Sequence, residues 1–373
     1  MSAVITKTAV PSLPGRITSV DFFRGFTMFL LAGEASGLYE TLFKFDSSIV
    51  QFFGTQLSHH EWHGLHFWDL IQPFFMFIVG VAIPFAVANR LKKGDSEQTI
   101  FNHALKRAFL LLFFGWALYF VEAGRFVLKL QNVLAQLSVT YFVAFLIRNK
   151  SFRFQLIFSL VILILIDLAY RFFPVAGYNH PWVNHENLGA WFNSKIEGTP
   201  KTSEWATLNF VSTTAHTIWG VMCGRLLMSD KPASEKIRLL VTAGIAALCV
   251  GYVLDGLGIT PIIKKIATSS FVFASGGWTI LALAFSYWLI DVRKQFMEGS
   301  RFFIIVGMNS IFIYIFFHVG GANFIGELIE PFSKLFFSAA GELAVEVITC
   351  TMIWLGLWYI CYWLYKNKVF VKI

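Results

Sequence analysis

The chain has 373 residues, of which 56% are hydrophobic and only 14% are charged, and it contains 42 Phe and 12 Trp. Because a soluble domain carries roughly 25% charged residues, this composition excludes an ordinary soluble protein and favours an integral membrane protein. The net charge of +8 is spread over many loops without one dense basic patch, so we predict no nucleic-acid partner.

Nearly uncharged apolar runs recur along the whole chain, and each is long enough to cross a bilayer core about 30 Å thick. Such runs must be helical, since backbone groups in lipid have to pair within their own segment. We therefore expect an all-α, polytopic bundle of about ten spans. The expected spans cover residues 21–41, 66–88, 104–122, 132–147, 153–172, 209–227, 237–257, 269–290, 302–319 and 343–365.

Lysine and arginine are concentrated in one set of alternate loops, such as those around residues 90–107 and 148–153. The positive-inside rule places that set, and with it both termini, on the cytoplasmic side. Residues 1–16 are expected to form a short disordered cytoplasmic lead. No long polar linker divides residues 17–373, so we expect a single transmembrane domain.

Two of the expected outer segments are long and cover about residues 42–65 and 173–208. The second is rich in Asn, His, Trp, Gly and Pro. Loops of this length without regular structure are uncommon unless they have a function, so this segment either caps an opening on the outer side or is an ordinary connection.

The first expected helix carries three ionisable residues. Asp21 and Arg24 are three residues apart, so they can form an ion pair at its inner end. Glu34 lies near its outer end. A buried glutamate there can act as an acid or a base, whereas one already in the headgroup region has no such role.

The most informative stretch is residues 58–86, where four of the nine histidines of the chain are close together: His59, His60, His63 and His66. Histidine titrates near neutral pH, so this cluster suits proton or acyl transfer. The alternative is a surface cluster at the membrane interface, where Trp62 and its aromatic neighbours form a belt.

A metal site is not predicted from this cluster. The residues from His60 to His63 read H-E-W-H, one residue short of the zinc signature H-E-x-x-H. His59 and His63 have the spacing of a ligand pair, but the spacing offers no third ligand.

Several polar residues within the expected spans are further candidates. Asp69 and Gln72 lie one helical turn apart and should face a bundle interior or a wet cavity, because an ionisable side chain is costly in lipid. The weaker candidates, each of which taken alone is commonly a helix–helix hydrogen bond, are Gln131, Asn132, His216 and Asn309.

Five segments in chain order resemble the heparan-α-glucosaminide N-acetyltransferase family: residues 19–28, 59–83, 130–142, 261–277 and 306–315. The resemblance is carried by D-x-x-R-G from Asp21 and by H-x-x-W-x-G-L-x-x-x-D-L from His59 to Leu70. It implies that an acyl group moves from cytoplasmic acetyl-CoA to an amino sugar or glycan on the outer side.

The resemblance also assigns roles to residues of this sequence. His59 is the catalytic base or acyl carrier and Asp69 the conserved aspartate, while Glu34 stands where the family has asparagine. Candidate acceptor-binding residues are His60, Glu61, His63, Gln72, Gln131, Asn132, His216 and Asn309. By charge and side of the membrane, candidate residues for binding coenzyme A are Arg24, Arg90, Lys92, Lys93 and Arg107.

From the family resemblance we also expect a homodimer, located in the inner membrane of a bacterium. Two other functions stay open. One is a proton-coupled transporter or exporter of a sugar-like solute, with Glu34, His59 and Asp69 as the proton relay. The other is a non-catalytic membrane scaffold.

Overall fold

The computed structural model describes residues 17–197 and 203–371. The expected disordered lead, residues 1–16, lies outside the described residues. The described residues form helices and connecting segments and contain no strand, which confirms the all-α class. The first half contains α1 (Thr18–Ala35), α2 (Leu38–Thr41), η1 (Leu42–Lys44), α3 (Ser48–Gln56), η2 (Phe67–Leu70), α4 (Ile71–Lys92), α5 (Glu97–Ala123), α6 (Val133–Leu146), α7 (Phe152–Arg171) and α8 (Leu188–Glu197).

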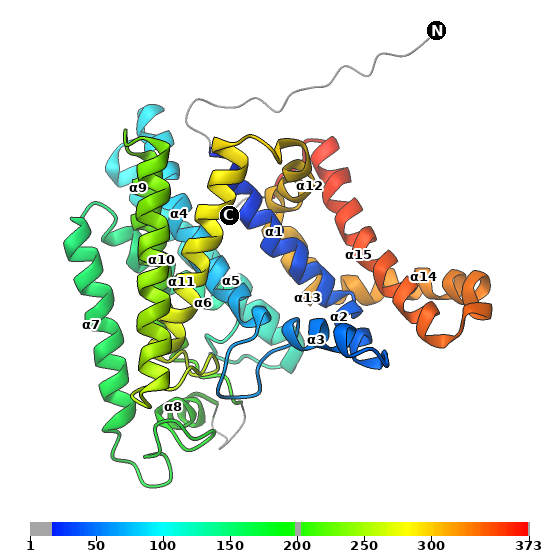
Figure 1. The fold of residues 1–373 in the computed structure, drawn as a ribbon, viewed down its shortest axis with the longest axis horizontal. Coiled ribbons are helices and arrows are strands. Elements are labelled where there is room, and N and C mark those ends of the chain that lie inside the picture. The colour runs from blue at the N-terminus through cyan, green and yellow to red at the C-terminus, as the bar shows by residue number, and fades with distance from the viewer. Residues whose placement is uncertain (1–16, 198–202, 372–373) are drawn as a thin grey trace.

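The second half continues as a series of long helices. It contains α9 (Asn209–Met228), α10 (Ala233–Gly256), α11 (Ser269–Ser286), η3 (Tyr287–Val292), α12 (Met297–Met308), α13 (Ser310–His318), α14 (Gly321–Phe337), η4 (Ser338–Ala340) and α15 (Glu342–Lys366). The start of α1 and the end of α15 lie at the same end of the bundle (Figure 1). The expected location of both termini on the cytoplasmic side stays a prediction.

Within the described residues, six helices are long and apolar enough to cross a bilayer, and the bent pair α12–α13 would make a seventh. The protein is therefore an integral, multi-pass membrane protein. The other expected spans are helical too, but α6 is short and α1 and α9 carry more polar residues. The count of about ten spans stays a prediction.

The centre of the bundle is formed by α4, α9 and α11, whose side chains are mostly buried, whereas α7 and α10 are mostly exposed at the periphery. Glycines bring the backbones of α4 and α9 into direct contact. A Cβ on Gly220 would lie 2.1 Å from the carbonyl oxygen of Phe77, and one on Gly80 would lie 2.0 Å from that of Thr217. This contact fixes α4 against α9 and leaves another face of α4 free for cavities.

The two long outer segments contain helices of their own. Residues 42–65 include η1 and α3, and the segment from 173 to 208, as far as it is described, includes α8. The indole of Trp62 donates a hydrogen bond of 2.8 Å to the backbone oxygen of Trp182, so the second segment contacts the histidine-rich stretch.

Gly220→Ala tests the α4–α9 contact. The added methyl group forces these helices apart, and overpacking of this kind costs roughly 1–3 kcal/mol, so we expect a lower apparent melting temperature in detergent. Gly256→Ala at the end of α10 is the control, because a Cβ there meets no atom within 4 Å. Equal melting temperatures for the two variants would contradict the tight contact.

Candidate functional site

The histidine-rich stretch enters α4 through the short helix η2, and the carboxylate of Asp69 lies in this first turn. Its Oδ2 accepts hydrogen bonds from the backbone N–H of His60 at 3.2 Å and of His66 at 2.8 Å. A carboxylate at a helix N-terminus also interacts favourably with the helix dipole. Asp69 thus folds residues 58–66 back over the start of α4.

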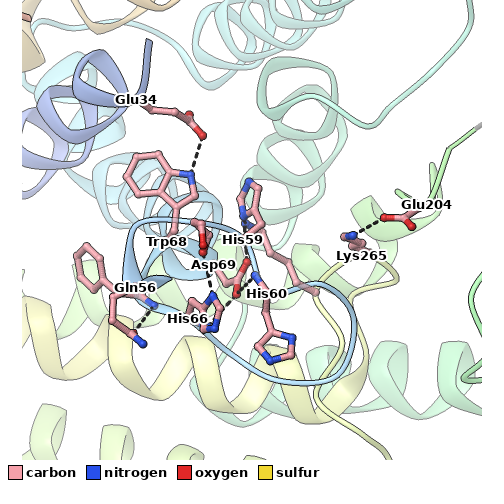
Figure 2. Close-up of polar contacts among 12 residues, drawn as sticks. Glu34, Gln56, His59, His60, His66, Trp68, Asp69, Glu204 and Lys265 are labelled. Carbon is pink, nitrogen blue, oxygen red and sulfur yellow. Dashed lines mark hydrogen bonds and ion pairs between the residues drawn. The ribbon is translucent and has the colours of Figure 1, made fainter. Parts of the chain in front are cut away.

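The other oxygen of Asp69 faces two nitrogens from distant parts of the chain. Oδ1 lies 3.0 Å from Nδ1 of His59 and 3.4 Å from Nζ of Lys264, and these two nitrogens are themselves 3.0 Å apart. Figure 2 shows Asp69 among His59, His60 and His66. A carboxylate, an imidazole and an ammonium therefore meet at one point, and we call these three residues the outer cluster.

Burial divides the outer cluster into a structural and an accessible part. The side chains of Asp69 and Lys264 are 1% and 6% exposed, whereas that of His59 is 39% exposed. Removal from water lowers the pKa of His59, and the Lys264 ammonium adds to this, while Asp69 opposes both. His59 is therefore neutral at pH values where a free histidine is already partly charged, so its ring can act as a base.

An aromatic side chain from the second outer segment borders the cluster. The ring of Trp205 lies edge-on to His59 at 5.3 Å, and Nζ of Lys264 lies 5.3 Å from the same indole ring. The neighbouring Glu204 pairs with Lys265, which lowers the pKa of the Glu204 carboxyl group. The segment around residues 203–208 is thus attached to the loop that carries Lys264.

Glu34 joins the site through an indole. Its Oε1 accepts a hydrogen bond of 2.8 Å from Nε1 of Trp68, the residue before Asp69 (Figure 2). Among the described residues no bond links Glu34 directly to His59. The geometry therefore places Glu34 beside the cluster, as a neighbour that positions Trp68.

A chain of amide side chains leads from the cluster into the bundle. Gln72 donates to Oε1 of Gln136 at 2.7 Å, and Gln136 donates to the backbone oxygen of Gln131 at 2.9 Å. Oε1 of Gln131 in turn accepts a hydrogen bond of 3.3 Å from Ser203 in the second outer segment. Gln72 and Gln131 are thus linked through Gln136, and their role in acceptor binding stays a prediction.

Two cavities with basic linings lie further along the bundle. The first, of about 290 Å³, is mainly apolar and is lined by Phe75, Leu137 and Tyr314 among others, together with Arg24 and Arg107. The second, of about 280 Å³, also reaches Arg107 and is lined in addition by Arg90, His103 and Lys106. The two cavities share Arg107 at their boundary.

Arg107, unlike Arg24 and Arg90, has no carboxylate partner among the described residues. Its guanidinium lies 4.9 Å from the ring of Tyr141, and its buried Nε has no hydrogen-bond partner among the described residues. Arg90, in contrast, pairs with Asp95 at 3.0 Å, and Arg24 pairs with Asp21 at 2.8 Å, which confirms the expected ion pair of the first helix. Arg107 is thus available to bind an anion.

One face of α4 connects the outer cluster to both cavities. Asp69, Gln72 and Phe75 follow at helical spacing and are succeeded by the cavity-lining residues Ile78, Val79, Ala82, Ala86 and Arg90. At 1.5 Å per residue, this stripe runs for about 30 Å. From Phe75 to Arg90 this stripe lines the two cavities, and its outer end carries Asp69, the partner of His59.

The remaining candidates from the sequence lie elsewhere. Lys92 and Lys93 are exposed and line neither cavity, and Glu61 is exposed as well. His63 pairs with Asp255 at 2.7 Å. The other three candidates make buried structural bonds: Asn132 caps α6, His216 contacts Val272 and Ser275, and Asn309 binds the backbone of residues 369 and 371. Acceptor binding by these residues stays a prediction.

Lys264 and Trp205 are site residues that the sequence reasoning did not select. Both lie in outer segments far from His59 in the sequence, so no periodicity connects them to it. One feature of the sequence could have pointed to Lys264: it lies within residues 261–277, one of the five segments that resemble the family.

No family model matches the chain. It is 24% identical to mouse (Mus musculus) heparan-α-glucosaminide N-acetyltransferase over 438 residues, covering 97% of this chain and 61% of the relative. The human (Homo sapiens) protein of the same name is also 24% identical, over 97% of this chain and 60% of its own length.

The chain is thus similar over nearly its whole length to two N-acetyltransferases of the family that its sequence motifs resemble. The alignment includes nearly all of this chain, so it covers the outer cluster, α4 and the helices that line the cavities. The chain nevertheless spans only about three fifths of the length of these relatives.

Asp69→Ala tests whether the outer cluster stabilises the fold. Lys264 would be left buried without a carboxylate partner, and breaking a buried pair in this way costs about 3–5 kcal/mol. We expect a large drop in the apparent melting temperature in detergent. Glu346→Ala is the control, because Glu346 and its partner Lys44 are 39% and 54% exposed and exposed pairs contribute roughly 0–1 kcal/mol. Equal effects of the two changes would contradict a buried pair.

Proposed function

We propose that this protein is a transmembrane acyltransferase that takes an acetyl group from acetyl-CoA on the cytoplasmic side and delivers it to an amino sugar on the outer side. The main support is a neutral, accessible imidazole beside the start of α4, the helix whose further turns line two cavities that also contain arginines. The family relationship supports the same reaction class.

The chemistry requires a lone pair at the outer end of the stripe. When the ring of His59 carries its proton on Nδ1 and donates a hydrogen bond to Asp69, the lone pair on Nε2 is available. The amine nitrogen attacks the thioester carbonyl, the C–S bond breaks, Nε2 accepts the proton from the amine and the thiolate leaves. In the two-step route, Nε2 attacks the carbonyl, the C–S bond breaks and the thiolate leaves; the amine then attacks the acetyl carbonyl, the bond from Nε2 to the acetyl group breaks and Nε2 accepts the proton from the amine. Both routes need the same tautomer.

The donor fits the cavities by its chemistry. Acetyl-CoA combines a slender, largely uncharged arm that ends in the thioester with a nucleotide that carries phosphates. The apolar cavity suits the arm, and Arg90, Lys106 and Arg107 suit the phosphates, because charge-assisted hydrogen bonds to phosphate are among the strong ones. The nucleotide end would therefore lie at the end of α4 that we expect to face the cytoplasm, which in a bacterium is the inner side of the inner membrane.

His59→Gln tests the catalytic role. Purified protein in detergent receives acetyl-CoA and glucosamine, and release of coenzyme A is measured. Loss of a general base lowers the rate by about 10²–10⁴-fold, whereas His63→Gln, which removes a more exposed histidine paired with Asp255, should retain far more activity. Full activity of His59→Gln would eliminate the proposal. Because detergent abolishes any gradient, a transporter would show no turnover in this assay.

Arg107→Gln tests the donor site. Loss of one charge-assisted contact to a phosphate, worth about 1.5–3 kcal/mol, should raise the KM for acetyl-CoA by roughly tenfold to hundredfold. The value of kcat should change much less, because the contact is remote from the reacting atoms. Lys231→Gln, an exposed cation that pairs with Glu235, is the control. An unchanged KM in Arg107→Gln would place the nucleotide elsewhere.

A further inference from the structure

In the outer cluster, Asp69 and Lys264 both lie within hydrogen-bond distance of the same ring nitrogen of His59. Nδ1 of His59 lies 3.0 Å from Oδ1 of Asp69 and also 3.0 Å from Nζ of Lys264. Among the described residues, both side-chain hydrogen bonds of the ring involve Nδ1. A nitrogen that carries a proton can donate to Asp69, whereas one without a proton can only accept from Lys264. The two bonds therefore belong to different tautomers of His59.

The charge of Lys264 favours one of these tautomers. An ammonium can donate to Nδ1 and to Oδ1 at the same time, which satisfies all three groups and leaves the ring proton on Nε2. If Nδ1 kept its proton, that proton and the ammonium would face each other across 3.0 Å. Once Lys264 is neutral, this repulsion disappears and Nδ1 can donate to Asp69.

We propose that Lys264 is a positioning residue that controls the tautomer of His59, holding Nε2 protonated and inactive while it is charged and releasing the Nε2 lone pair when it is neutral. The consequence for acyl transfer rests on the proposed function. The tautomer itself does not, because it is a property of the ring in the resting protein.

The surroundings of Lys264 bring its titration close to neutral pH. It faces Asp69 from η2, His59 from the preceding loop and the indole of Trp205, and it interacts at longer range with Glu34 of α1 and with Lys265 beside it. Burial lowers the pKa of Lys264 to about 8, although Asp69 and Glu34 oppose the shift. Lys264 is therefore charged below this value and neutral above it, so the reactive tautomer increases as the pH rises through this range.

The tautomer can be measured without any activity. Protein with ¹⁵N-labelled histidine rings is studied by NMR in detergent at about pH 7 and about pH 9, either side of the titration range, and His59→Gln assigns the signal. We expect the wild-type ring to carry its proton on Nε2 at the lower pH and on Nδ1 at the higher. Lys264→Met should keep the proton on Nδ1 at both, and Lys264→Arg should keep it on Nε2 at both. A wild-type ring that does not change, or a Lys264→Arg ring that changes like the wild type, would overturn the inference.

The same variants separate this inference from the proposed function. With acetyl-CoA and glucosamine, the wild-type rate should rise through about pH 8, while Lys264→Arg should stay at least ~10-fold slower over the same range. The amine of the acceptor also loses a proton in this range, so the variants are compared on one acceptor. If Lys264→Met does not fold, Lys264→Arg retains the charge and carries the test. If no transfer occurs at all, the ring measurement still decides the role of Lys264.

Discussion

The burial of the Asp69 carboxylate is the constraint on which the rest of the site depends. A buried charge costs several kcal/mol unless it is paired and hydrogen-bonded. Asp69 meets this requirement with two backbone N–H groups, one imidazole and one ammonium. These partners come from residues 58–66 and from the loop before α11. Satisfying one carboxylate therefore positions the imidazole of His59 and the loop that carries Lys264.

Helix α4, which begins two residues after Asp69, then determines how the outer cluster and the cavities are related. Its contact with α9 is so close that Gly80 and Gly220 leave no room for side chains, which fixes the rotation of α4 about its axis. Once that rotation is fixed, the residues from Phe75 to Arg90 on this face line the cavities. The proposed transfer across a membrane would need a rigid connection of this kind, since donor and acceptor would not share one aqueous compartment.

The sequence predicted the helices well and the site in part. Apolar runs located most helices within a few residues, because bilayer-length hydrophobicity is a local signal. The sequence prediction missed the end of α1, which is followed by Gly37 with a φ of 81°. It also missed the break at Asn309, where α12 and α13 meet at 62°. Asp69 and Gln72 were predicted to share a face because they are neighbours on one helix. Lys264 and Trp205 reach the cluster only through tertiary folding, which no periodicity reports.

The negative charge of Asp69 and the positive charge of Lys264 have opposite effects on His59. A neutral histidine with only a carboxylate beside it would keep its proton on Nδ1 at every pH, whereas one with only an ammonium beside it would have no group to orient its ring. With Asp69 and Lys264 on the same nitrogen, the two charges largely cancel at a distance, while at short range they compete for one proton position. The net electrostatic field then stays small, and the choice of tautomer depends on a single proton on Lys264. The group that makes the burial of Asp69 tolerable is thus also the group best placed to govern when His59 reacts.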